Sequence, residues 1–137
     1  MEVKYKEYVI SDNKAEIHID KVCELLNASH WASNRSTEII ERSIENSICF
    51  GVYHNEKQIG FARSITDYSV IYWLCDVIIH EDYRGLGLGK ELISVIVKHE
   101  DLKGCTGFLA TKTAHGLYEK YGYKIVDEGR IMWRVAE

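Results

Sequence analysis

The chain has 137 residues, of which 46% are hydrophobic and 28% are charged, so we expect one globular domain over residues 1–137. The formal net charge of −4 argues against nucleic acid as a partner, because binding to phosphates needs a basic face. No apolar run approaches the roughly 20 residues of a membrane span, and the first residues lack the apolar core of a signal peptide. We therefore expect no membrane partner and a cytoplasmic location.

The cysteines are spread widely along the chain. They are Cys23, Cys49, Cys75 and Cys105. No Cys-x-x-Cys pair occurs, so we expect no metal site and no redox motif. Each lies among apolar residues, which is typical of reduced thiols that pack as small hydrophobic side chains.

The first third of the chain predicts a strand and two helices. Residues 5–10 are strand formers that precede a polar turn at 11–14. Asp20 is the expected N-cap of a helix whose apolar face includes Leu25, and Ser36 is the expected N-cap of the next helix. In that second helix we expect Ile39, Ile40 and Ile44 to face inward.

The middle of the chain predicts an antiparallel meander. Strand patterns cover residues 48–53, 58–66 and 70–79, with a hairpin turn at 54–57. Helical spacing follows from Leu86 and ends near Lys98, and a short strand is expected at 108–110. A strand–helix–strand connection of this kind makes its two strands parallel.

The last third predicts a helix and a closing hairpin. The helix covers residues 113–121 and ends at Gly122. The hairpin pairs residues 123–126 with 131–135 about a turn at 127–129. Together these elements predict a layered α/β fold.

A glycine-rich bend joins the strand that ends at Ile79 to the helix that follows. Gly85, Gly87 and Gly89 alternate between Arg84 and Lys90. Such a bend binds phosphate, because glycine lets the backbone approach a ligand and the free N–H groups of the helix start point at it. The spacing fits neither the dinucleotide fingerprint nor the P-loop.

Two segments resemble motifs of the GNAT N-acetyltransferase superfamily. Residues 84–89, Arg-Gly-Leu-Gly-Leu-Gly, resemble its acetyl-CoA signature, Arg/Gln-x-x-Gly-x-Gly/Ala. Residues 114–123, Ala-His-Gly-Leu-Tyr-Glu-Lys-Tyr-Gly-Tyr, resemble its second motif, Ala-x-x-Leu/Phe-Tyr-x-Lys-x-Gly-Phe/Tyr. The predicted order of elements is also that of the GNAT fold. The resemblance implies acetyl-CoA as cofactor and a mixed, mostly antiparallel central sheet with helices on both faces in a single layered domain.

The resemblance also implies which residues hold coenzyme A. Backbone groups at the strand end would contact the pantetheine and the acetyl carbonyl; these residues are Val77, Ile78 and Ile79. The bend would surround the pyrophosphate with Arg84, Gly85, Gly87, Leu88, Gly89 and Lys90. Core packing of the same side chains is compatible with this role, because only their backbone binds.

Tyr118 and Asp76 are the candidate catalytic residues. Tyr118 stands where the second motif has its tyrosine, and a tyrosine stays protonated at neutral pH while matching a departing thiol in acidity. Its alternative is a packing role on its helix. Asp76 interrupts an apolar strand, where a carboxylate is costly unless it has a partner. It is either the base for the amine or a structural partner of Arg63 or Arg35; Asp67, Glu81 and His30 are further candidates for the base.

The acceptor site is expected at the loop of residues 29–35 and the nearby strand ends. Its candidate residues are His30, Trp31, Arg35, Arg63 and Asp67. Trp31 suits a small-molecule pocket, and a core anchor is its alternative. Arginines facing the pocket would favour an acceptor with a carboxylate or phosphate, whereas Asp76 and Asp67 would favour a cationic amine.

These features predict an enzyme that moves an acetyl group from acetyl-CoA directly to a primary amine of a small molecule. Two alternatives stay open: acetylation of a protein N-terminus or lysine, and a non-catalytic module that binds acyl-CoA. The chain is expected to be a monomer or a homodimer, for which the closing strands offer an edge.

Overall fold

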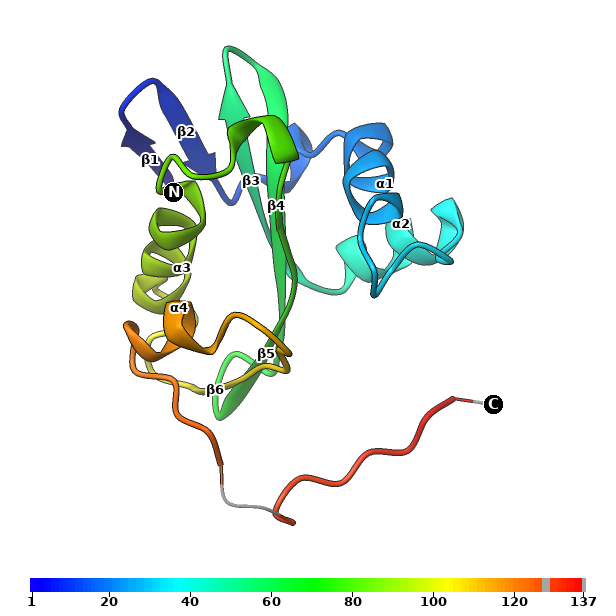
Figure 1. The fold of residues 1–137 in the computed structure, drawn as a ribbon, viewed down its shortest axis with the longest axis vertical. Helices are drawn as coiled ribbons and strands as arrows, with labels where there is room; N and C mark the ends of the chain where they lie inside the picture. Colours follow the sequence, from blue (N-terminus) through cyan, green and yellow to red (C-terminus); the bar gives the residue numbers. More distant parts are fainter. Residues whose placement is uncertain (127–128, 137) are drawn as a thin grey trace.

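The computed structural model describes residues 1–126 and 129–136, and it contains one mixed sheet (Figure 1). The strands follow the order β1-β2-β3-β4-β5-β6, and all neighbours are antiparallel except β5 and β6, which are parallel. Their bounds are Glu2–Tyr5, Tyr8–Ser11, Ile48–His54, Lys57–Thr66, Ile71–Ile79 and Thr106–Phe108. The predicted meander and the parallel pair are confirmed.

Helices cover both faces of the sheet. On one face lie α1 (Ile19–Asn27) and α2 (Thr37–Glu45), and on the other lie α3 (Leu88–Lys98) and α4 (His115–Glu119) (Figure 1). Short 3-10 turns occur at Lys14–Glu16 (η1) and Glu81–Tyr83 (η2). Each face has its own core: Leu92 and Ile96 of α3 belong to one cluster, and Leu26 and Ile40 to the other. The predicted layered α/β fold is confirmed.

The start of the chain differs from the predicted single strand. Lys6 has a φ of 54°, and the turn there folds residues 2–11 into the β1–β2 hairpin. Asp20 is not the N-cap of α1, because the helix begins at Ile19 after His18. Asp20 lies instead in the first turn, where a carboxylate suits the positive end of the helix dipole.

The second helix begins as predicted. The Ser36 hydroxyl accepts the N–H of Ile39, and α2 follows from Thr37. Ile40 and Ile44 are buried, but Ile39 is exposed, contrary to the prediction. Three isoleucines do not all fit one stripe because Ile39 precedes Ile40 by about 100° around the helix.

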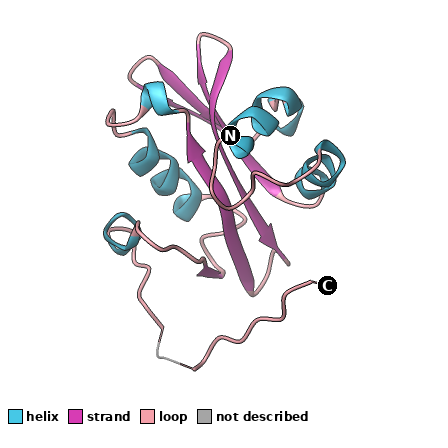
Figure 2. Cartoon of the chain, turned by 45° about the vertical axis from the view of Figure 1, so that its right-hand side comes forward, coloured by secondary structure: helices cyan, strands magenta, loops and turns pink. Residues whose placement is uncertain are grey.

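The end of the chain differs most from the prediction. Residues 123–126 and 129–136 form no strand, and residues 129–136 extend away from the sheet (Figure 2). Residues 127 and 128 of the predicted turn lie outside the described residues. Met132 and Trp133 are largely exposed. A period-two apolar pattern forms a strand only where a sheet edge pairs with it, and no strand pairs with residues 131–135 in the described structure.

Smaller differences concern burial and element bounds. The strand at 108–110 is observed at Thr106–Phe108, and the helix at 113–121 is the shorter α4. All four cysteines are free, but only Cys49 is fully buried. Among the residues that the structure describes, no helix is both long and apolar enough to cross a bilayer.

Candidate active site

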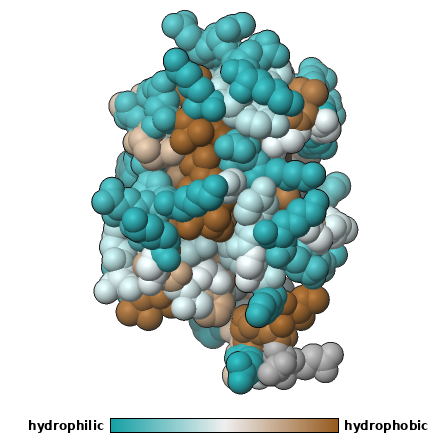
Figure 3. All heavy atoms as spheres, turned by 90° about the vertical axis from the view of Figure 1, so that its left-hand side faces the viewer, coloured by the Kyte–Doolittle hydropathy of each residue, from teal (hydrophilic) through white to brown (hydrophobic). Residues whose placement is uncertain are grey.

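The head of α3 has backbone N–H groups that make no hydrogen bond to a backbone carbonyl in the described structure. The first backbone hydrogen bond of the helix is donated by the N–H of Glu91 to the carbonyl of Gly87, at 3.1 Å. Within the described chain, the N–H groups of residues 85–90 have no protein acceptor. Arg84 and Lys90 are exposed beside them. Figure 3 shows that polar side chains cover much of this side of the molecule, with apolar groups between them. This geometry suits an anion such as a diphosphate.

Glycine is required at two positions of this bend. Gly85 and Gly87 have φ values of 78° and 84°, in the left-handed region that other residues avoid. A Cβ on Gly87 would also lie 2.6 Å from the hydroxyl of Tyr5, which donates to the Leu86 carbonyl at 3.3 Å. The β1–β2 hairpin therefore supports the bend through Tyr5. Sequence reasoning missed this contact because the two residues are 81 positions apart.

A bulge in β5 lies next to the predicted acetyl position. The register places Phe61 opposite Ile78 but Arg63 opposite Cys75, so two residues of β5 stand against Ala62. Asp76, at the bulge, has a φ of 56°. Aspartate adopts this conformation more readily than most residues do. The bulge reverses which residues of β5 point to each face of the sheet.

The second half of β5 has a free edge. Strand β6 pairs only with residues 71–73, and no other described strand pairs with this edge of residues 74–79. His80 donates its N–H to the carbonyl of Ile59 in β4, and the carbonyl of Ile79 accepts Arg84 Nε. By alternation, Val77 and Ile79 direct their backbone groups to the free edge, whereas Ile78 faces β4. The edge can accept an extended ligand as an added strand.

The side chain of Asp76 lies in an ion-pair network on the α1–α2 face. Its Oδ2 accepts Arg35 Nη1 at 2.7 Å and Arg63 Nε at 2.6 Å. The Asp76 side chain is 1% exposed, and its Oδ1 has no hydrogen-bond partner in the described structure. Arg63 also donates to Ser47 Oγ. These contacts match the predicted structural role of Asp76 as a partner of Arg63 or Arg35. Its role as the base for the amine stays a prediction.

Tyr118 lies on the opposite face. Its side chain packs against the core cluster that contains Leu92 and Ile96 of α3, and Val77 packs against the same cluster. Burial raises the pKa of its hydroxyl, so the group is protonated at neutral pH. Tyr118 contacts the ring of Tyr123 edge-on, and the Tyr123 hydroxyl shares a hydrogen bond of 2.5 Å with that of Tyr72.

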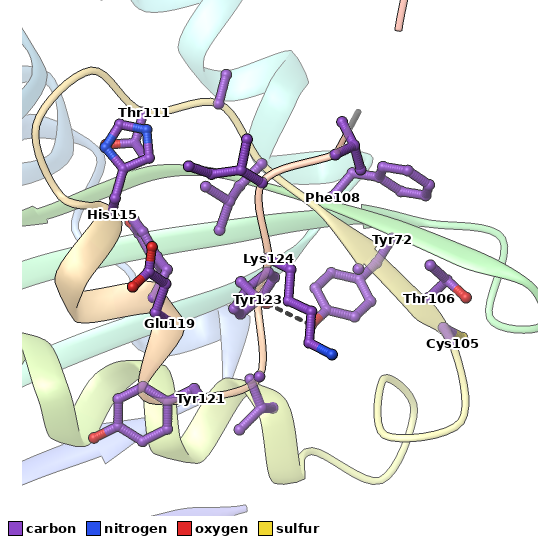
Figure 4. Close-up of a pocket in the computed structure, with 18 of the residues that line it drawn as sticks. Tyr72, Cys105, Thr106, Phe108, Thr111, His115, Glu119, Tyr121, Tyr123 and Lys124 are labelled. Atoms are coloured by element: carbon purple, nitrogen blue, oxygen red, sulfur yellow. Dashed lines mark hydrogen bonds between the residues drawn. The ribbon is translucent and has the colours of Figure 1, made fainter. Parts of the chain in front are cut away.

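A cavity of about 540 Å³ adjoins Tyr118. Figure 4 shows its wall, formed by residues of β6, α4 and the segment after α4, including His115 and Tyr121. The residues of the bend at 84–90 do not line this cavity. The structure therefore has two parts of the expected site, an open helix head and a cavity at Tyr118, at different places on the α3–α4 face.

The thiols nearest the network are unsuited to nucleophilic catalysis. Burial raises the pKa of Cys49 and of Cys75 to about 11 in each case. Both are therefore thiols at neutral pH, whereas the thiolate is the reactive form.

The predicted acceptor residues fall into two groups. Arg35 and Arg63 meet at Asp76, as described. His30 and Trp31 are exposed on the loop before α2, so the interpretation of Trp31 as a core anchor is wrong; Ala32 is the buried residue of this loop. The loop directs the side chain of Ala32 toward the core and leaves that of Trp31 at the surface.

Asp67 lies apart from that network, in the turn between β4 and β5. Its carboxylate accepts the N–H groups of Ser69, Val70 and Ile71. The hydrogen bond from Val70, followed by those from Ser69 and Ile71, lowers the pKa of Asp67. Asp67 thus stabilises the turn between the two strands.

The layered fold, the unbonded N–H groups at the head of α3 and the bulged strand are the features that the comparisons with known proteins must match. The profile of the "Acetyltransferase (GNAT) domain" family matches residues 45–125. An uncharacterized N-acetyltransferase, ycf52, from Pyropia yezoensis is 28% identical over 88% of this chain and 72% of its own length. The chain belongs to the GNAT acetyltransferase family, whose members are acyltransferases.

Solved structures agree with this assignment. A protein from Xanthomonas campestris pv. campestris described as belonging to the GNAT family has a TM-score of 0.91 and 31% identity, covering 97% of this chain and 96% of its own. An aminoglycoside 6'-N-acetyltransferase complexed with coenzyme A shares the fold, with a TM-score of 0.72 and 18% identity over 86% of each chain. The chain spans 72%, 66% and 62% of the lengths of three curated relatives.

Proposed function

We propose that the chain transfers the acetyl group of acetyl-CoA directly to the primary amine of a small molecule. The observation that carries this proposal is the row of N–H groups without acceptors at the head of α3, which follows the free edge of β5 in the chain. The N–H groups suit the diphosphate of the cofactor, and the free edge of β5 suits its pantetheine arm. The solved relative complexed with coenzyme A has the same fold, which further supports this cofactor.

The chemistry requires an acid for the leaving group. The amine nitrogen attacks the thioester carbonyl and forms the C–N bond, the nitrogen loses a proton to water, the C–S bond breaks, and the sulfur receives a proton from the acid. Tyr118 fits this role because its hydroxyl keeps its proton at neutral pH. The protonated thiols Cys49 and Cys75 agree with transfer without a covalent enzyme intermediate.

Asp76 enters this proposal as the residue that positions Arg35 and Arg63. One of its oxygens already accepts both arginines, and the other is buried.

The test is an acceptor screen. Purified protein is mixed with acetyl-CoA and either small primary amines or lysine-containing and N-terminal peptides, and free thiol is measured over time. We expect release with small amines well above the rate without amine. Release with peptides alone would identify a protein acetyltransferase, and release with neither would contradict the proposal.

A further inference from the structure

Building on the proposed function, we propose that the acceptor amine also carries an anionic group, a carboxylate or a phosphate, and that Arg35 binds it. The network on the α1–α2 face contains two guanidinium groups and one carboxylate. Its formal charge is therefore positive by one unit. A positive charge that is partly removed from water favours a negative ligand.

The charges around the network can be compared at the two nearest thiols, those of Cys75 and Cys49. The thiol of Cys75 is a neighbour of Asp76 in the chain, and the charged groups that act on it are Arg63, Asp76 and Arg35. The Cys49 thiol lies in β3. The charged groups that act on it include Arg63 and Asp76 again, and the addition is Lys14, which is another cation. Among the described residues around these two thiols, Asp76 is thus the single counter-charge.

Arg35 is the member of the network that a solute can reach. Its side chain is 29% exposed, whereas the side chain of Arg63 is 11% exposed and that of Asp76 only 1%. Arg63 uses Nε for Asp76 and Nη1 for Ser47. Arg35 directs Nη1 to Asp76, and a guanidinium carries five donors in a planar fork that matches a carboxylate or phosphate.

The same geometry argues against a cationic acceptor. Such an amine would need an available carboxylate, and Asp76 is already paired with two arginines. Asp67, the other carboxylate considered for this site, accepts three backbone N–H groups in its turn. The exposed aromatic side chain of Trp31 lies on the loop that ends at Arg35, where it can cover the carbon skeleton of an acceptor.

The experiment compares matched acceptors. Amines of equal length are used with a carboxylate, with a phosphate, without charge and with a second ammonium group. We expect kcat/KM to be at least about tenfold higher for the anionic members, since only they make a charge-assisted hydrogen bond to Arg35. The carboxylate and phosphate arms distinguish which anion is preferred.

Variants assign the effect to Arg35. Arg35→Gln should raise KM for the anionic amines about tenfold or more and leave KM for neutral amines unchanged, while Arg35→Lys should retain part of the preference. Arg42→Gln, on the exposed surface of α2, is the matched control and should change neither value. Thermal melting checks that each variant folds.

Each outcome bears on a different claim. Equal kcat/KM for anionic, neutral and cationic amines in the unaltered protein, or the same loss for all amines in Arg35→Gln, would overturn this inference and leave the acetyltransferase proposal standing. Thiol release from no amine at all, although coenzyme A binds, would overturn both.

Discussion

Tyr118 is the residue on which the proposed chemistry depends most. Its hydroxyl is the group of the second motif that can protonate the leaving thiolate. We predict that Tyr118→Phe lowers kcat by about a hundredfold or more, because a positioned acid contributes that much, and changes KM for acetyl-CoA little. Initial rates over a range of acetyl-CoA concentrations measure both values.

Tyr121→Phe provides the matched control for this change. Tyr121 borders the same cavity and also lies next to the α3 core, so its substitution tests for a general loss of packing. Equal rates in Tyr118→Phe and the unaltered protein would remove Tyr118 as the acid.

The pH dependence provides an independent check on the same residue. Burial raises the pKa of Tyr118 above its ordinary value of 10. The acid must be protonated to act, so activity is retained below that pKa and lost as pH rises through it. We predict an alkaline fall in kcat above pH 10 that is absent in Tyr118→Phe. A fall centred near pH 8 in both proteins would show that another group limits the rate.

At the scale of single elements, the bend before α3 is the part most sensitive to small changes. We predict that Gly87→Ala weakens coenzyme A binding about tenfold or more, because alanine resists a φ of 84° and its methyl group would meet Tyr5. Calorimetric titration with coenzyme A measures the affinity, and circular dichroism checks the fold.

Gly89→Ala is the control within the same turn. Gly89 does not need a positive φ, and a Cβ there meets no atom within 4 Å. The acetyl-CoA signature that the sequence resembles also allows alanine at this position. Unchanged affinity in Gly87→Ala, or an equal loss in both variants, would contradict the geometry assigned to the bend.

Local signals predicted most elements but not their exceptions. The Ser36 cap and the bend after β5 are encoded by neighbouring residues, so the sequence was sufficient to identify them. The bulge at Asp76 was not predicted, because a single extra residue leaves the apolar pattern of a strand nearly unchanged. The predicted closing strands at 123–126 and 131–135 are not observed. Strand pairing there depends on a free edge of the sheet, which the sequence of the segment itself does not reveal.

At the scale of the whole molecule, the candidate site combines predicted and unpredicted parts. The bend and Tyr118 were found by motif, and the structure places the helices that follow and carry them, α3 and α4, on the same face of the sheet (Figure 1). Tyr5 and the exposure of Trp31 depend on how distant segments fold together, and no local pattern indicates them. Arg35 and Arg63 were named as candidates, but only the fold brings both to one carboxylate oxygen.

The measurement that tests the central claim most directly is the response of backbone amides to coenzyme A, followed by ¹⁵N–¹H correlation spectra of the full chain. If the head of α3 holds the diphosphate, the amide signals of residues 85–90 shift most, and those at the free edge of β5 shift with them. Shifts confined to the cavity beside Tyr118, with the amides of residues 85–90 unchanged at saturation, would contradict this account.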